Sequence, residues 1–392
     1  MRKFLKVLRT LIIAAVALVG LVYGAVFVGH RFLFKTRSSE TPTIPPAQNA
    51  EFTLGVQAHA QPSTMDGYIL LLAEQVKNYS RVAPKLWSDN ALVDRLVIVE
   101  AVDSGKFWRI APDGTVTPLS RDDALDCGLE RMAYSGGFSE FDGGIYLSVS
   151  EDDLRNVLLY QQYLHLGSYD PFITFTHEDF HGAEQAKWAD VKDMPNTQRE
   201  EFTENTAARA KRDLLQRQLL RAIAAPGDTA LILDALATYD DYKAQFPDDF
   251  KNSAFADRIE GTAYYYELIS CLYSSYPDKV KTEDDLTRAL ALLATREDVY
   301  VDHGLVKEGY NVGGFACILL DRLEDDWQPR LMKDAKLTPI EMLREHFAGE
   351  ALPAPQPLTQ ADVDDVAEEI NAPPEGDSGP ARLFDALYQL LF

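Results

Sequence analysis

Two histidines four residues apart, His177 and His181, constrain this chain more than any other feature; they lie in the segment FITFTHEDFHGAEQAKW at residues 172–188. On a helix, side chains at this spacing share a face, so both imidazoles can point at one metal ion about 2.0–2.1 Å away. Glu178 then sits beside the metal, where a carboxylate can accept a proton from metal-bound water. The HExxH pattern therefore predicts a zinc-binding helix with its own general base.

The sequence around this pattern favours a helix. Asp170 suits the N-cap, Pro171 suits the first helical position, and no proline follows until Pro195. We therefore expect one continuous helix across both histidines. The alternative is an ordinary amphipathic helix whose two histidines are held by neighbouring side chains, although two of only seven histidines in the chain fall on these positions.

The N-terminus carries a long apolar run. Residues 11–29 are uncharged and would span about 28 Å as a helix, close to the hydrocarbon thickness of a bilayer. Four basic residues precede the run and three, with a histidine, follow it, which favours a cytoplasmic N-terminus. Residues 1–37 are therefore predicted to be a single-pass anchor in the cell inner membrane, with the rest of the chain periplasmic or extracellular. A cleaved secretory signal is the alternative.

Composition divides the remainder into three parts. Residues 38–52 are Pro-rich and lack hydrophobic periodicity, as expected of an extended linker. Residues 53–350 are long enough to bury a large core and form the predicted catalytic domain. Residues 351–392 are predicted to be a Pro-rich acidic tail that ends in an amphipathic helix.

Charge excludes one class of partner. Beyond the seven basic residues of the first 37, the chain has 31 Lys and Arg against 61 Asp and Glu, a formal charge of −30. So acidic a body argues against binding to nucleic acid or to anionic lipid. The predicted contact with the membrane is made through the N-terminal helix.

The secondary-structure pattern changes along the body. A helical segment at 69–82 is followed by short β-type runs at 96–101, 107–110, 115–119 and 144–150, with a turn signal, Pro-Asp-Gly, at 112–114. After the HExxH segment we expect helices at 199–224, 229–246, 253–276, 284–294 and 313–323. The predicted fold class is α+β, predominantly α-helical, with a small N-terminal β-sheet.

The strand at 144–150 has two interpretations. It comes shortly before the metal helix, and an exposed edge strand in that position can pair with an extended peptide substrate. It is otherwise an ordinary structural strand.

A zinc site needs a third protein ligand, and Glu260 is the preferred candidate. Gly261 and Ala263 follow it and would let its helix approach another backbone closely, and we expect the HExxH helix to be that neighbour. A carboxylate on a face adjoining the buried one is either a ligand or a costly buried charge.

Two motifs together resemble a known group. HEDFH at 177–181 and EGTAYYYE at 260–267 are similar to the motifs of gluzincin zinc metallopeptidases, and GYNVGGFACILLDRL at 309–323 resembles a Tyr-x-x-Gly helix of uncharacterised bacterial membrane-anchored peptidases. The resemblance implies a zincin-like fold and one Zn²⁺ per chain, held by two histidines and a glutamate. It also leaves a second candidate. The ligand usually follows the second histidine after 18 residues, which here gives Glu200, whereas 78 residues separate His181 from Glu260.

Other residues have less specific assignments. Tyr310 or His303 is a candidate donor to the oxyanion of a tetrahedral intermediate. Glu204 and Glu267 are candidates for orienting a ligating imidazole. The three cysteines, at positions 127, 271 and 317, are too few for a disulfide framework and are expected to be buried free thiols.

The sequence therefore predicts a membrane-anchored zinc metallopeptidase that hydrolyses a peptide or protein substrate, with Glu178 as the base and His177, His181 and Glu260 as ligands. One alternative is a catalytically silent, membrane-anchored binding or assembly protein that keeps the fold. Another is a zinc amidase acting on a non-protein substrate.

Overall fold

The computed structural model describes residues 64–87, 96–126, 138–141, 144–150, 171–189, 205–295, 297, 301, 305–323 and 326–371. The chain divides into two units, Pro45–Ile370 and the two chain ends together, and the elements described below belong to the first, apart from the last residue of α14, Asn371. The predicted anchor, linker and C-terminal helix lie outside the described residues. Within those residues, no helix combines the length and apolar character needed to cross a bilayer.

The observed class is α+β and mostly helical, as predicted. The helices are α2 (Met65–Leu86), α3 (Arg121–Asp126), α5 (Pro171–Asp179), α6 (Thr206–Ala224), α7 (Thr229–Gln245), α8 (Pro247–Ser275), α9 (Glu283–Ala294), α11 (Leu305–Leu320), α12 (Trp327–Lys333), α13 (Pro339–His346) and α14 (Gln360–Asn371). The strands are β1 (Leu96–Ala101), β2 (Lys106–Ile110), β3 (Val116–Leu119), β4 (Phe138–Phe141) and β5 (Gly144–Val149).

The five strands form one sheet in the order β3-β2-β1-β5-β4. β2 and β3 form a hairpin across the predicted turn, in which Gly114 has φ +83° and Asp113 Oδ1 accepts from the Thr115 amide. β5 pairs in parallel with β1 and antiparallel with β4. The interpretation of residues 144–150 as an exposed edge strand is therefore wrong, because both sides of β5 are already hydrogen-bonded; among the described strands the edges are β4, next to β5, and β3.

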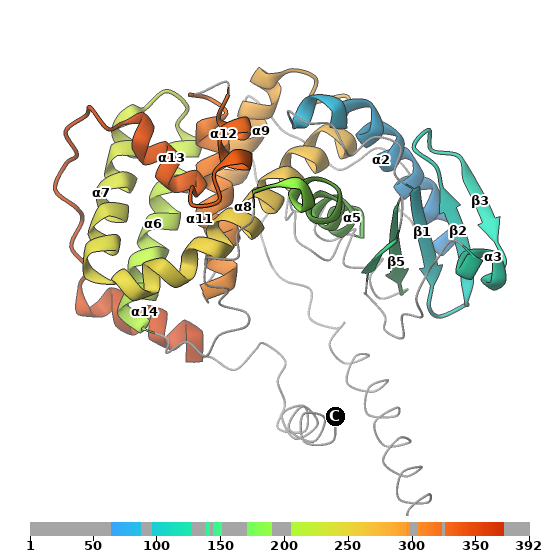
Figure 1. Cartoon of the computed structure of the whole chain (residues 1–392), viewed down its shortest axis with the longest axis horizontal. Coiled ribbons are helices and arrows are strands. Elements are labelled where there is room, and N and C mark those ends of the chain that lie inside the picture. Colours follow the sequence, from blue (N-terminus) through green and yellow to red (C-terminus); the bar gives the residue numbers. More distant parts are fainter. Residues whose placement is uncertain are drawn as a thin grey trace, which may run out of the picture. The chain divides into compact units, whose positions relative to one another are not determined.

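The sheet separates two hydrophobic clusters of different size. Val97 and Val99 of β1 face the main core, which also holds buried side chains of α2, α5, α8 and α11. Ile98 points to the other face and packs with Ala124 of α3. This alternation is the period-two pattern of a strand buried on both faces. Figure 1 shows α2 and α5 next to the strands, and α5 contacts both β4 and β5.

The HExxH helix changes its hydrogen-bonding pattern between the two histidines. α5 ends at Asp179, a π-helical turn η1 follows at Phe180–Glu184, and a 3₁₀ turn η2 ends the segment at Gln185–Lys187. The predicted helix therefore does run across both histidines, but its second half is a π turn and a 3₁₀ turn and not α-helix. A π turn has wider hydrogen-bonded rings than an α-helix and occurs frequently at functional sites.

The other helices differ from expectation mainly at their starts. α6 begins at Thr206 because the Asn205 side chain caps the amides of Ala207 and Ala208. α8 extends to Pro247, which takes the first helical position, and α11 includes eight residues before the predicted start at 313. Cys271 and Cys317 are buried and free, as expected, while Cys127 lies outside the described residues.

Glycines bring α8 and α11 into very close contact. A Cβ added at Gly313 would lie 1.9 Å from the carbonyl oxygen of Asp257, and one added at Gly309 would lie 2.4 Å from Ala256 Cβ. Gly261 faces Gly313 in the same way. The close approach predicted from Gly261 is therefore present, but its partner is α11 and not the HExxH helix. The contact places Tyr310 of α11 beside Glu260 of α8.

Candidate metal centre

His177 and His181 converge from the end of α5 and the π turn that follows it. Their Nε2 atoms are 3.0 Å apart, and the two rings are nearly perpendicular at a centroid distance of 4.7 Å. His177 is buried, whereas the His181 side chain is 22% exposed. The pair therefore lies close to the surface, with His181 on the more accessible side.

Glu260 supplies a third donor atom from the middle of α8. Its Oε2 lies 3.5 Å from His177 Nε2 and 3.4 Å from His181 Nε2. One point can lie at bonding distance from all three atoms, because the circle through them has a radius of about 1.9 Å, just below the usual zinc–nitrogen distance of about 2.0–2.1 Å. Glu200, the other candidate ligand, lies outside the described residues.

Each imidazole is held from its far side by a hydrogen bond. His177 Nδ1 is 2.8 Å from Glu267 Oε2, so Glu267 takes the orienting role suggested by the sequence. His181 Nδ1 is 2.6 Å from Gln185 Oε1, a contact that the sequence analysis missed. Such outer partners fix the orientation of a ligating ring and leave Nε2 directed at the metal position. Glu204 lies outside the described part of the chain.

The electrostatics of the cluster favour a positive charge. Burial alone would lower the pKa of His177, but hydrogen bonds with Glu260 and Glu267 raise it to about 10. Burial would raise the pKa of Glu260, yet its hydrogen bonds with the two histidines lower it well below the ordinary value. Without a metal the site therefore retains a proton, and with a metal that proton gives way to the ion.

Tyr310 and Glu178 complete the surroundings. The Tyr310 ring stacks on His177 at 5.4 Å and 7°, and its hydroxyl hydrogen-bonds Glu260. Burial and the Glu260 charge raise the pKa of Tyr310, so it remains a hydrogen-bond donor at neutral pH. Glu178 is half-buried, and its charge acts on both His177 and Tyr310. His303 lies outside the described residues.

A buried ionic network lies beside the cluster and was not predicted. Arg209 and Arg212 of α6 both pair with Glu308 of α11, two residues before Tyr310. The same arginines pair with Asp249 and with Asp257, which precedes Glu260 by three residues. The network therefore ties together the segments of α8 and α11 that carry Glu260 and Tyr310.

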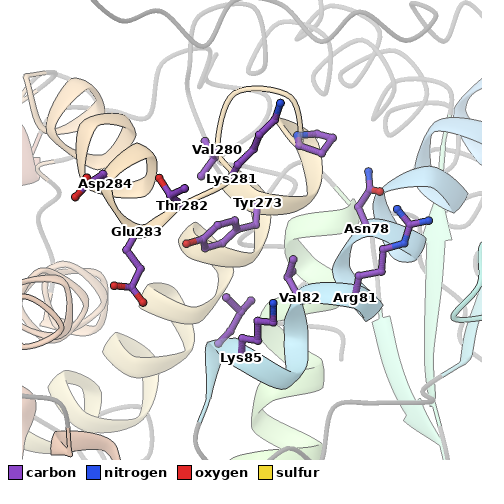
Figure 2. Close-up of a pocket in the computed structure, with 12 residues that line it drawn as sticks. Asn78, Arg81, Val82, Lys85, Tyr273, Val280, Lys281, Thr282, Glu283 and Asp284 are labelled. Atoms are coloured by element: carbon purple, nitrogen blue, oxygen red, sulfur yellow. The ribbon is translucent and has the colours of Figure 1, made fainter.

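A separate pocket of about 760 Å³ lies between the C-terminal half of α2, the end of α8 and the start of α9 (Figure 2). Arg81, Lys85 and Lys281 line it together with Glu283 and Asp284. None of the metal-cluster residues line this pocket. Because cationic and acidic side chains share its wall, its composition does not indicate one class of ligand.

Comparisons with protein-family models, with curated proteins and with solved structures find no match for this chain. The geometry of the site is therefore the basis for assigning a function.

Proposed function

We propose that this chain is a zinc-dependent hydrolase with a zincin-like fold that cleaves peptide bonds. One observation carries the proposal: His177 Nε2, His181 Nε2 and Glu260 Oε2 converge on a common point, and the charge of the neighbouring residue Glu178 acts on His177. Two imidazoles and one carboxylate are a common ligand set of catalytic zinc, with a fourth position left for water or substrate.

The protein residues have distinct roles in the proposed reaction. His177, His181 and Glu260 would hold the zinc ion, which would act as a Lewis acid toward the scissile carbonyl and lower the pKa of bound water. Glu178 accepts the proton of the attacking water and passes it to the leaving amine nitrogen. The Tyr310 hydroxyl, which stays protonated, donates a hydrogen bond to the carbonyl oxygen as negative charge develops there. Glu267 holds the His177 ring in position through Nδ1.

An extended substrate can be bound by the edge of the sheet. β4 is the last strand in the sheet order, and α5, which carries His177, contacts it directly. An edge strand offers backbone donors and acceptors to a peptide that is added alongside it. In this proposal β4 takes the role that the sequence analysis considered for residues 144–150.

The location of the enzyme is part of the proposal. The apolar run at residues 11–29 anchors the chain in the inner membrane, and the Pro-rich stretch that follows holds the body on the periplasmic side. A reporter that is active only in the cytoplasm, fused after Phe392, is expected to be silent. Strong reporter activity would show that the C-terminus lies in the cytoplasm, which is the opposite of the proposed orientation.

The proposed activity is tested on the full-length chain purified in detergent. Elemental analysis is expected to give one zinc per chain, and the protein is expected to cleave casein or members of a peptide library. A chelator should abolish cleavage, and added zinc should restore it. A chain that holds zinc but cleaves neither substrate would contradict the peptidase proposal and favour a binding or assembly role.

A further inference from the structure

The side chain of Gln185 bridges the second histidine and α8. Its Oε1 lies 2.6 Å from His181 Nδ1, and its Nε2 lies 2.8 Å from the carbonyl oxygen of Ile259 and 2.7 Å from Thr262 Oγ1. Gln185 is the first residue after the π turn, and its two contacts on α8 flank Glu260. A single amide therefore connects the surroundings of two candidate ligands.

Hydrogen-bond chemistry fixes which way this amide points. The carbonyl oxygen of Ile259 can only accept, so it requires the NH₂ group of Gln185. The Thr262 hydroxyl donates to the carbonyl oxygen of Arg258 at 2.7 Å, which leaves its own oxygen to accept from the same NH₂ group. Both contacts give the same orientation, with the amide oxygen of Gln185 facing His181.

The orientation of Gln185 determines the tautomer of His181. An amide oxygen has no proton to donate, so the short contact with Nδ1 requires that Nδ1 carries the hydrogen. The lone pair of a neutral His181 is then on Nε2, the atom that faces His177 Nε2 and Glu260 Oε2. This is the tautomer that can donate to a metal at the common point.

We propose that Gln185 is a positioning residue that holds His181 in the Nδ1–H tautomer and so keeps Nε2 available for Zn²⁺. The inference builds on the proposed function, because it takes zinc as the cation of the site. Metal affinity then depends on the acceptor oxygen of Gln185. It does not depend on the hydrogen bonds from the Gln185 amide nitrogen to α8.

Three variants of the full-length chain separate the acceptor from the link. Gln185→Leu removes both, and zinc affinity measured by competition with a chromophoric chelator is expected to fall by about 10–100-fold. Gln185→Glu keeps an acceptor oxygen for Nδ1–H but removes the donors to Ile259 and Thr262, and its affinity is expected to stay within about threefold of wild type. Thr262→Val removes one anchor and leaves the acceptor, with the same expectation. Circular dichroism verifies that each variant is folded.

Two results would overturn the assignment: Gln185→Leu binding zinc as tightly as wild type, or Gln185→Glu weakened as much as Gln185→Leu. A second measurement does not depend on any variant. In the zinc-loaded wild type, ¹⁵N resonances should show His181 protonated at Nδ1 and metal-bound at Nε2. A His181 ligated through Nδ1 would refute the proposal.

The outcomes also distinguish this inference from the proposed function. Wild-type protein that binds zinc with the expected tautomer but hydrolyses no peptide would contradict the hydrolase and leave the role of Gln185 standing. Wild-type protein that takes up no zinc would overturn both.

Discussion

Gly261 of α8 and Gly313 of α11 meet so closely that a Cβ built on Gly261 would lie 2.5 Å from Gly313 Cα. At this distance the backbones of the two helices are in contact, and neither position has room for a methyl group. The contact sets the spacing between the helix that carries Glu260 and the helix that carries Tyr310.

Gly313→Ala is therefore expected to destabilise the protein. The new methyl group would meet the backbone oxygen of Asp257, which cannot rotate away, and overpacking of this kind typically costs about 1–3 kcal/mol. Urea unfolding measures the loss. The control is Gly349→Ala, where nothing lies within 4 Å of the added Cβ, and its effect should stay within about 0.5 kcal/mol. Equal stabilities for the two variants would show that α8 and α11 are not this close.

The buried ionic network allows a comparison of two variants on the same helix, one at a buried arginine and one at an exposed arginine. Arg212 is fully buried and pairs with Asp257 and Glu308, so Arg212→Met would leave carboxylates without their cation and is expected to cost about 3–5 kcal/mol. Arg221, also on α6, is 52% exposed and pairs with Glu297 near the surface. Arg221→Met should cost less than about 1 kcal/mol. Similar losses in urea unfolding would contradict the buried position of Arg212.

Glu178→Gln tests the general base. The amide is nearly isosteric with the carboxylate but cannot accept the proton of the attacking water, so kcat is expected to fall by about 10²–10⁴-fold. Zinc content and circular dichroism should match wild type, because Glu178 is not one of the three converging candidate ligands. A variant that hydrolyses peptide at a near wild-type rate would remove Glu178 from the mechanism.

Zinc binding is expected to release protons. Hydrogen bonds with Glu260 and Glu267 raise the pKa of His177 to about 10 despite burial, so the metal-free site is protonated at pH 7.5 and zinc must displace that proton. Calorimetric titration in two buffers of different ionisation enthalpy should report release of about one proton per zinc. Binding enthalpies that do not depend on the buffer would contradict this account.

The same pKa gives a pH dependence for the metal-free protein. The folded-state pKa of His177 lies above its ordinary value of about 6.5, so between about pH 6.5 and 10 the folded chain binds more protons than the unfolded chain. The stabilisation from His177 is complete below that window and is lost as the pH rises through it. The free energy of unfolding should therefore fall across this range, and His177→Gln should remove that part of the dependence.

The sequence predicted which residues form the candidate site better than it predicted which neighbouring segments they contact. The four-residue spacing of His177 and His181 indicates convergence without any knowledge of the fold, and Glu260 followed from the small residues beside it. The helix that Gly261 contacts could not be predicted, because a glycine permits close approach to any neighbour. The helical pattern likewise gives no sign of the π turn at Phe180–Glu184 or of the Gln185 contact.

For charged residues in a helix, the sequence does not indicate whether the side chain is buried or exposed. Arg209 and Arg212 lie in a run rich in Glu, Ala, Arg and Gln, which is also the composition of a solvated helix face. Only the packing of α6 against α11, together with its ion pairs to α8, reveals that both guanidinium groups are buried against carboxylates. The sheet shows the same limit, because residues 144–150 look like a strand but their neighbours depend on chain topology.

The zinc content of two glutamate variants tests the central claim most directly. Glu260 supplies one of three donor atoms that converge on a single point, so Glu260→Ala removes both a candidate anionic ligand and the geometry of the site. We expect Glu260→Ala to purify folded, by circular dichroism, and with little zinc, whereas Glu200→Ala should retain nearly one equivalent. A folded Glu260→Ala protein that is zinc-replete, together with a folded Glu200→Ala protein that is empty, would contradict the account and place the third ligand at position 200.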